Sequence, residues 1–210
     1  MHQAARLAVR FAIAGIGTGV GKTLVAALFV ERLGAAYWKP IQAGGLAHTD
    51  TEEVRRLVTL SRAPFLPEAY SLHAAMAPDA AAAQEGVTLR KEGLRLPDAE
   101  GPLVVEPAGG VLVPVADGLL NVDLLKYWNL PVVVVSSYYL GSINHTLLTV
   151  EALNSRELPL AGIVFNGERN DHSRSVILRE TGLKCLLDLP KLRQPVSPRQ
   201  VKAYAARIDL

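Results

Sequence analysis

Near the start of the chain lies the glycine-rich stretch Gly15-Ile16-Gly17-Thr18-Gly19-Val20-Gly21-Lys22-Thr23, referred to below as the phosphate loop. Its four glycines let the backbone approach an anion closely, and its N–H groups, with the helix N-terminus that follows, attract phosphate. Lys22 is expected to reach the outer phosphates and the Thr23 hydroxyl to hold Mg²⁺. The first glycine stands one residue earlier than in the usual spacing, so the alternative is an ordinary glycine-rich turn with a solvated lysine. We predict a nucleotide-binding loop formed by Gly15, Gly17, Thr18, Gly19, Val20, Gly21, Lys22 and Thr23.

A second cation and two carboxylates follow other apolar segments. Lys39 precedes a proline at the end of a short apolar run, where its charge would neutralise a transferred phosphoryl group; the alternative is a solvated surface lysine. Glu106 ends a buried strand, where a carboxylate is costly unless it is paired or bound to a metal. Asp50 opens a helical segment and is either a helix cap or a second carboxylate for the ion. We therefore predict that Thr23, Asp50 and Glu106 hold Mg²⁺.

Several loops further along the chain have the composition of ligand contacts. Gly109 permits a close approach to a ligand just after Glu106. A buried strand then leads into Gly141-Ser142-Ile143-Asn144, whose N–H groups and Asn144 amide would hold a substrate carboxylate, unless Asn144 only caps the helix. Asn166 ends another strand, where its amide would read a base edge, although Asn-Gly is equally a turn signature.

The elements that must position these residues alternate between strands and helices. Runs such as Val132–Val135 have no polar alternation, which is typical of strands covered on both faces. This pattern predicts a doubly wound, mainly parallel α/β sheet with helices on both faces, with ligands at the carboxyl ends of the strands. The region between residues 62 and 101 has no clear strand. Predicted strands are 7–14, 35–39, 102–106, 111–115, 131–136, 160–165 and 184–188, and predicted helices are 21–33, 50–60, 86–96, 121–128, 143–154, 171–181 and 198–207.

Composition limits the class of protein. The chain has 210 residues, half of them apolar, which suits a single domain spanning residues 1–210. The formal charge of +2 is spread along the chain, so no basic stripe indicates nucleic acid. Apolar runs have strand length only, which argues against a membrane span, and the run that follows Arg10 breaks at Gly15, unlike a signal peptide. The lone Cys185 cannot form an internal disulfide. We expect a soluble cytoplasmic protein.

Taken in order, these stretches resemble the dethiobiotin synthetases, biotin-pathway ligases of the P-loop NTPase type. The likeness covers most of the chain and is weak between residues 62 and 101. Besides the phosphate loop with its longer spacing, it rests on Lys39-Pro40, Thr49-Asp50, Glu106 with Ala108-Gly109-Gly110, Leu140-Gly141-Ser142-Ile143-Asn144-His145, and Gly162 through Asn166.

The resemblance implies a reaction. CO₂ carboxylates 7,8-diaminopelargonate to a carbamate, ATP phosphorylates the carbamate, and the second amine closes the ring to give dethiobiotin, ADP and phosphate. It implies that Lys22, Lys39 and Thr18 are catalytic at the γ-phosphate, that Glu106 and Asn166 contact the nucleotide, and that Lys39 and Gly109 contact substrate. It also implies that Gly141, Ser142, Ile143 and Asn144 hold the substrate carboxylate of the neighbouring subunit in a homodimer.

Departures from the family pattern lie nearer to the substrate and the base than to the phosphates. They are Gly19 for glutamate, Ala43 for a hydroxyl residue, Asp79 for histidine, Pro107 for glycine and Gly167 for aspartate. The main alternative is a partner-binding switch ATPase of the ParA/MinD type, which carries a lysine five residues before the main one, where this chain has Gly17. Cobyrinate amidotransferases are longer and carry a glutaminase domain, and an inactive nucleotide-binding relative is a third alternative.

Overall fold

The computed structural model describes residues 9–60 and 63–210. Its elements are β1 (Arg10–Gly15), α1 (Lys22–Leu33), β2 (Ala36–Trp38), β3 (Ile41–Ala43), α2 (Asp50–Leu57), β4 (Phe65–Leu66), β5 (Tyr70–Leu72), α3 (Pro78–Glu85), the 3₁₀ turn η1 (Lys91–Leu94), β6 (Leu103–Val105), β7 (Pro114–Ala116), β8 (Leu119–Leu120), α4 (Asn121–Trp128), β9 (Val132–Ser137), α5 (Ser142–Asn154), β10 (Leu160–Gly167), α6 (Asp171–Thr181), β11 (Cys185–Pro190) and α7 (Pro198–Ala205).

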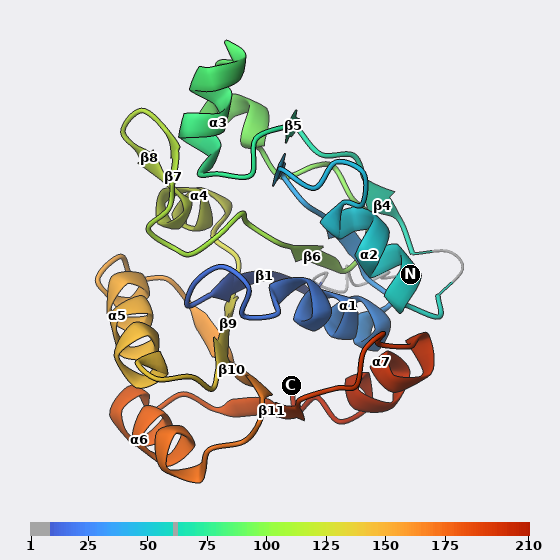
Figure 1. Cartoon of the computed structure of the whole chain (residues 1–210), viewed down its shortest axis with the longest axis vertical. Helices are drawn as coiled ribbons and strands as arrows, with labels where there is room; N and C mark the ends of the chain where they lie inside the picture. The colour runs from blue at the N-terminus through green and yellow to red at the C-terminus, as the bar shows by residue number, and fades with distance from the viewer. Residues whose placement is uncertain (1–8, 61–62) are drawn as a thin grey trace, which may run out of the picture.

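A seven-stranded sheet in the order β11-β10-β9-β1-β6-β2-β4 forms the centre of the molecule, and all of its pairings are parallel. Strands β6, β2 and β4 lie on one side of β1, and β9, β10 and β11 lie on the other side. The chain forms β1, β2 and β4 first, returns to β6 beside β1, and then adds β9, β10 and β11 in order. Because parallel crossovers are right-handed, α1 and α2 cover one face, and α4, α5 and α6 cover the other. The last helix, α7, packs beside α1, and α5 packs beside α6 (Figure 1). The predicted doubly wound fold is confirmed.

The strand order reverses at β1, which lies between β9 and β6. In open α/β sheets, ligands bind at this switch point, beyond the carboxyl ends of the strands. The phosphate loop follows β1 there, because the fully buried residues Ala12 and Ile13 hold β1 in the core and the middle of α1, Val25–Val30, is buried on all sides. The core continues through Val132–Val135, all with no exposed surface, as predicted for a strand covered on both faces.

The predictions fail mainly between residues 63 and 120. The helix predicted at 86–96 is wrong: the helix is α3, which begins with Pro78 at its first turn and ends at Gly86 with φ of +66°. The strand predicted at 111–115 starts only at Pro114, and β7 forms an antiparallel hairpin with β8 outside the main sheet. Three short strands that were not predicted, β4, β5 and β8, also lie in this part of the chain.

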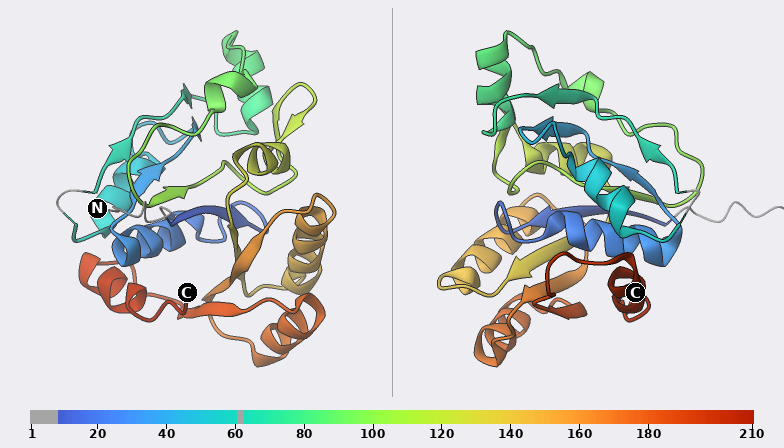
Figure 2. Two further views of the ribbon diagram at one scale, coloured as in Figure 1. Left: turned by 180° about the vertical axis from the view of Figure 1, so that it is seen from behind. Right: turned by 45° about the vertical axis from the view of Figure 1, so that its right-hand side comes forward.

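The hairpin of β7 and β8 lies against α3 at one end of the molecule (Figure 2). The Asp117-Gly118 pair forms the turn of this hairpin. Predicted strand positions 7 and 8 lie outside the described residues. Within the described ranges, no helix has both the length and the apolar character needed to cross a membrane.

Candidate active site

The phosphate loop curls between β1 and α1 with Lys22 folded back over it. The Lys22 ammonium donates to the carbonyl of Gly17 at 3.0 Å, and the side chain is buried. Gly21 has φ of +94°, which glycine adopts without strain, and a Cβ at this position would collide with the amide of Asn166. The Asn166 amide donates to the carbonyl of Val20 at 3.0 Å. The end of β10 therefore braces the loop at the residues just before Lys22.

Strand register brings Lys39 and Glu106 together. Trp38 of β2 pairs with Val105 of β6, so the residues that follow them leave the sheet side by side. The N–H of Glu106 donates to the carbonyl of Trp38 at 3.0 Å, and the Lys39 ammonium lies 3.3 Å from Oε1 of Glu106. Both side chains are buried, with Lys39 4% and Glu106 1% exposed. The interpretation of Lys39 as a solvated surface lysine is wrong.

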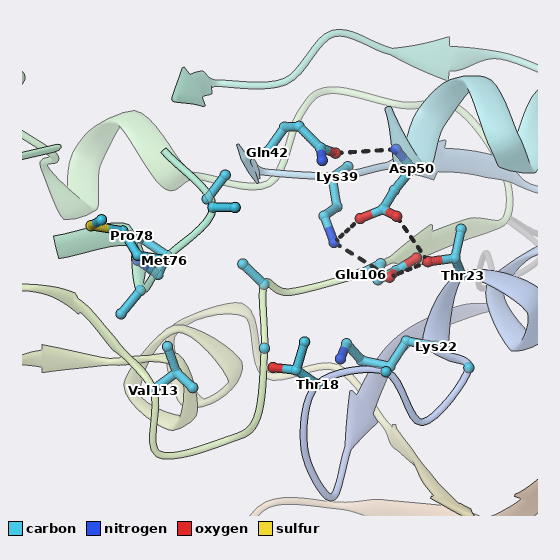
Figure 3. A pocket seen from close by; sticks show the side chains of 17 residues that line it. Thr18, Lys22, Thr23, Lys39, Gln42, Asp50, Met76, Pro78, Glu106 and Val113 are labelled. Atoms are coloured by element: carbon cyan, nitrogen blue, oxygen red, sulfur yellow. Dashed lines mark hydrogen bonds and ion pairs between the residues drawn. The ribbon is translucent and has the colours of Figure 1, made fainter. Parts of the chain in front are cut away.

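Asp50 reaches the same group from the first turn of α2. The residue that caps this helix is Thr49, through a capping box with Glu52, so the Asp50 carboxylate is free to turn toward the sheet. It lies 2.6 Å from the Lys39 ammonium. The Thr23 hydroxyl is 3.0 Å from Asp50 Oδ1 and 3.0 Å from Glu106 Oε1, which links the two carboxylates (Figure 3). The alternative in which Asp50 only caps the helix is also wrong.

Burial and neighbouring charges shift the pKa values of Lys39, Asp50 and Lys22. Burial by itself would lower the pKa of Lys39, but the charges of Glu106 and Asp50 hold it above its ordinary value. Burial likewise opposes ionisation of Asp50, yet Lys39 and the hydroxyl of Thr23 hold the pKa of Asp50 below its ordinary value. Burial lowers the pKa of Lys22, which has no such close carboxylate partner among the described residues. Lys39 is thus a firmly charged cation, and Lys22 is a desolvated one that an anion would stabilise.

A cavity of about 580 Å³ opens beside these groups. Thr18, Lys22, Thr23, Lys39, Asp50 and Glu106 form its polar side, and Met76, Pro78 and Val113 lie across from them (Figure 3). Ala43, Ala75, Ala77 and Ala108 add further apolar lining. Gly19, Gly21 and Gly109 also line it. The cavity therefore combines a charged end with an apolar wall.

Other predicted residues lie outside this cavity. Gly15, Gly17 and Val20 shape the phosphate loop without lining the cavity, and Asn166 supports the loop from behind. Gly141, Ile143 and Asn144 line a separate hollow of about 880 Å³ at the start of α5. Asn144 is exposed and is not the cap, because Gly141 precedes the first turn of the helix. Ser142 is buried, and its hydroxyl has no hydrogen-bond partner among the described residues.

Three residues that hold the site in place were missed in the sequence. The Tyr37 hydroxyl donates to Glu106 Oε2 at 2.8 Å. The Gln42 amide accepts from the N–H of Asp50 at 3.1 Å and donates to the carbonyl of Gly44 at 2.9 Å. Asn121, the first residue of α4, is buried and donates to the carbonyls of Ala108 and Gly110. In the sequence, the signal at each of these positions is a polar residue between two apolar neighbours.

The donor set suits Mg²⁺ bound to a nucleotide. Two carboxylates and one hydroxyl converge, which leaves the other ligand positions to phosphate oxygens and water, as Mg²⁺ prefers. In the part of the chain that the structure describes, no cluster of three or more His, Cys, Asp or Glu residues offers an all-protein metal site.

Comparison with known proteins agrees with this geometry. The family model described as "AAA domain" matches residues 10–199. An ATP-dependent dethiobiotin synthetase BioD from Cytophaga hutchinsonii is 44% identical over 95% of this chain and 96% of its own length. The protein of the same name from Rhodopseudomonas palustris is 44% identical over 94% of this chain and 92% of its own length.

Among solved structures, a ParA family ATPase from Chlorobium tepidum superimposes with a TM-score of 0.56 over 94% of this chain and 98% of its own. At 12% identity, this likeness establishes the fold alone. The sequence relatives decide the narrower question: the chain belongs to the AAA domain family of this model and, within it, to the ATP-dependent dethiobiotin synthetases.

Proposed function

We propose that this chain closes the ring of dethiobiotin from 7,8-diaminopelargonate, CO₂ and ATP, with the cavity beside the phosphate loop as the reaction site. The observation that carries the proposal is the convergence of Lys22, Lys39 and the Asp50–Glu106 pair at one end of this cavity. The apolar wall opposite them suits the aliphatic part of the diamine, and the charged end suits phosphate and carbamate oxygens.

The proposed reaction has three steps. One amine of the substrate attacks CO₂ and loses a proton, which leaves a carbamate. A carbamate oxygen then attacks the γ-phosphorus of ATP, and ADP leaves. The second amine attacks the carbamate carbon and loses a proton, the C–O bond to the phosphoryl group breaks, and phosphate departs.

The residues act mainly through position and charge. Lys22 neutralises the outer phosphates, which also offsets the cost of its own burial. Lys39 lies between the loop and the substrate end of the cavity, where its fixed positive charge stabilises the charge that develops on the transferred phosphoryl group and the carbamate. Thr18 lines the cavity at the γ-phosphate end, and Gly109 lets the substrate approach the segment that follows Glu106.

Thr23, Asp50 and Glu106 hold Mg²⁺ in this proposal. When bound, the ion neutralises phosphate charge and helps to align the γ-phosphoryl group. The same two carboxylates lie beside the Lys39 ammonium, and each is 3.0 Å from the Thr23 hydroxyl.

A homodimer completes the site. Gly141, Ser142, Ile143 and Asn144 hold the substrate carboxylate of the neighbouring subunit, with the N–H groups at the start of α5 as donors. Gly141, Ile143 and Asn144 line a hollow other than the first cavity, which favours contact with the substrate of a neighbouring subunit. Leu140 is fully exposed and Leu148 is 55% exposed on the same segment, which gives the subunits an apolar contact.

The nucleotide base lies beside Asn166, whose side-chain oxygen remains available while its amide group donates to Val20. The enzyme works in the cytoplasm, in keeping with its single cysteine and with substrates that are small metabolites.

A coupled assay tests the proposal. Purified protein with ATP, Mg²⁺ and bicarbonate is expected to release phosphate only when the diamine is present, with one dethiobiotin formed per phosphate. Lys22→Ala is expected to abolish both products. Phosphate release of equal speed without the diamine would contradict the proposal and favour the switch ATPase.

A further inference from the structure

Tyr37 is a polar residue in a strand whose other side chains serve the core. It lies in β2, has no exposed surface, and its hydroxyl donates to Glu106 Oε2 at 2.8 Å. A phenylalanine would fill the same space next to Phe65, so packing alone gives no reason for the hydroxyl.

The two oxygens of Glu106 have separate surroundings. Oε2 accepts from Tyr37 in the interior, whereas Oε1 accepts from Thr23 Oγ1 at 3.0 Å and from Lys39 Nζ at 3.3 Å. A carboxylate anchored through one oxygen cannot rotate about its terminal bond without breaking that hydrogen bond, which would leave a buried donor and a buried acceptor without partners.

We propose that Tyr37 is a positioning residue for the cation site, which reserves Oε2 of Glu106 so that this carboxylate offers a divalent cation Oε1 alone. The inference rests on the proposed function in one respect, the placement of the cation beside Thr23, Asp50 and Glu106. Without the hydroxyl, Glu106 turns more freely and Oε1 is no longer held beside Thr23. Partners of this kind behind a metal ligand are typically worth about 10–100-fold in metal affinity.

Manganese binding measures this role without catalysis. Mn²⁺ is titrated into the protein with saturating ADP, and free Mn²⁺ is followed by electron paramagnetic resonance. Tyr37→Phe is expected to weaken Mn²⁺ binding about tenfold. The matched control is Trp38→Phe, on the same strand, which removes another side-chain hydrogen bond, from Trp38 Nε1 to the carbonyl of Pro67 at 3.1 Å. The hydrogen bond from the Glu106 N–H to the Trp38 carbonyl is made by the backbone and is kept in this variant. The Mn²⁺ affinity of Trp38→Phe is expected to equal that of the wild type. Equal Mn²⁺ affinity in Tyr37→Phe and wild type would overturn the proposal, as would an equal loss in Trp38→Phe.

A double-mutant cycle checks that Tyr37 acts through Glu106. In a Glu106→Gln background, Tyr37→Phe is expected to produce no further loss of Mn²⁺ affinity, and a further tenfold loss would overturn the proposal. Should Tyr37→Phe fail to fold, 3-fluorotyrosine at position 37 keeps the hydroxyl. Its fluorine resonance is expected to shift when Mg²⁺ is added to the ADP complex, and an unmoved resonance would overturn the proposal.

The binding experiments need no diamine, so they separate the two claims. Absence of dethiobiotin formation by the wild type would refute the proposed function alone. Unchanged Mn²⁺ binding in Tyr37→Phe would refute only the role of Tyr37.

Discussion

Replacing Lys39 with methionine keeps most of the length of the side chain and removes its charge. In the wild type, this ammonium lies 2.6 Å from Asp50 and 3.3 Å from Glu106, and the Glu106 side chain is 1% exposed. Removing one partner of a buried ion pair typically costs about 3–5 kcal/mol, because the other charge stays buried. Tyr37 and Thr23 still donate to Glu106, and Asp50 is one-third exposed. We therefore expect Lys39→Met to lower the free energy of unfolding by an amount at the low end of this range, about 3 kcal/mol.

For a chain of this size, 1 kcal/mol shifts the melting temperature by about 2–4 °C, so Lys39→Met is expected to melt about 6–12 °C below wild type. The assay is thermal unfolding followed by circular dichroism without nucleotide or metal. Lys22→Met is the matched control: its ammonium has no carboxylate within ion-pair distance among the described residues, and burial lowers its pKa, so its charge contributes little to the stability of the free protein. It is expected to melt close to wild type. Equal melting of Lys39→Met and wild type, or an equal loss in Lys22→Met, would refute this reasoning.

Three other predictions follow from the same geometry. Gly21→Ala places a Cβ against Asn166 at a φ of +94° and is expected to weaken ADP binding, measured by calorimetry, more than about tenfold. The control Gly34→Ala, at the other end of α1, has a φ of +62° and open space around it, and is expected to leave ADP affinity unchanged. Equal ADP affinities of the two variants would contradict the contact between Asn166 and the phosphate loop. Burial raises the pKa of Asp50, but Lys39 outweighs burial and lowers this pKa below 3.8. As the pH falls, Asp50 is therefore protonated in the unfolded chain before it is protonated in the folded protein. The contribution of Asp50 to the free energy of unfolding is therefore present above about pH 4 and lost as the pH falls below it. Asp50→Asn is expected to reduce the fall of the urea unfolding midpoint at acid pH, and an unchanged fall would exclude the Lys39–Asp50 pair as its cause. Leu140→Asp is expected to convert a dimer to monomers in sedimentation velocity and to lose turnover with it, and a wild type that sediments as a monomer would contradict the shared site.

Most of the central sheet was predictable from the sequence because β1, β9, β10 and β11 are largely apolar strands of six to eight residues, whereas the two-residue strand β4 was not predicted. Val132–Val135 have no polar alternation, and burial on both faces follows directly from that pattern. The part between residues 63 and 120 was harder, since its strands have two or three residues and do not form a periodic pattern. The helix predicted at 86–96 starts eight residues after the start of α3. Pro78 in the first turn and Gly86 after the last turn mark the true ends of α3 in the sequence.

The charged centre of the site was also predictable, because each of its residues follows a strand or opens a helix at the carboxyl edge of the sheet. Lys39 and Glu106 meet through the pairing of Trp38 with Val105, which the sequence implies only once the strand order is known. The supporting residues were not predictable. Gln42 lies in the short strand β3 between Ile41 and Ala43, and Tyr37 has the sequence context of an ordinary strand aromatic until its hydroxyl is located beside Glu106.

The most direct test follows an oxygen atom from bicarbonate to phosphate. If a carbamate oxygen attacks the γ-phosphorus beside Lys22 and Lys39, and the C–O bond later breaks, the released phosphate keeps one oxygen that came from CO₂. With ¹⁸O-labelled bicarbonate, the diamine, Mg²⁺ and ATP, mass spectrometry of early product is expected to show one ¹⁸O in each phosphate. Phosphate formed together with dethiobiotin but carrying no label would contradict transfer to the carbamate at this site.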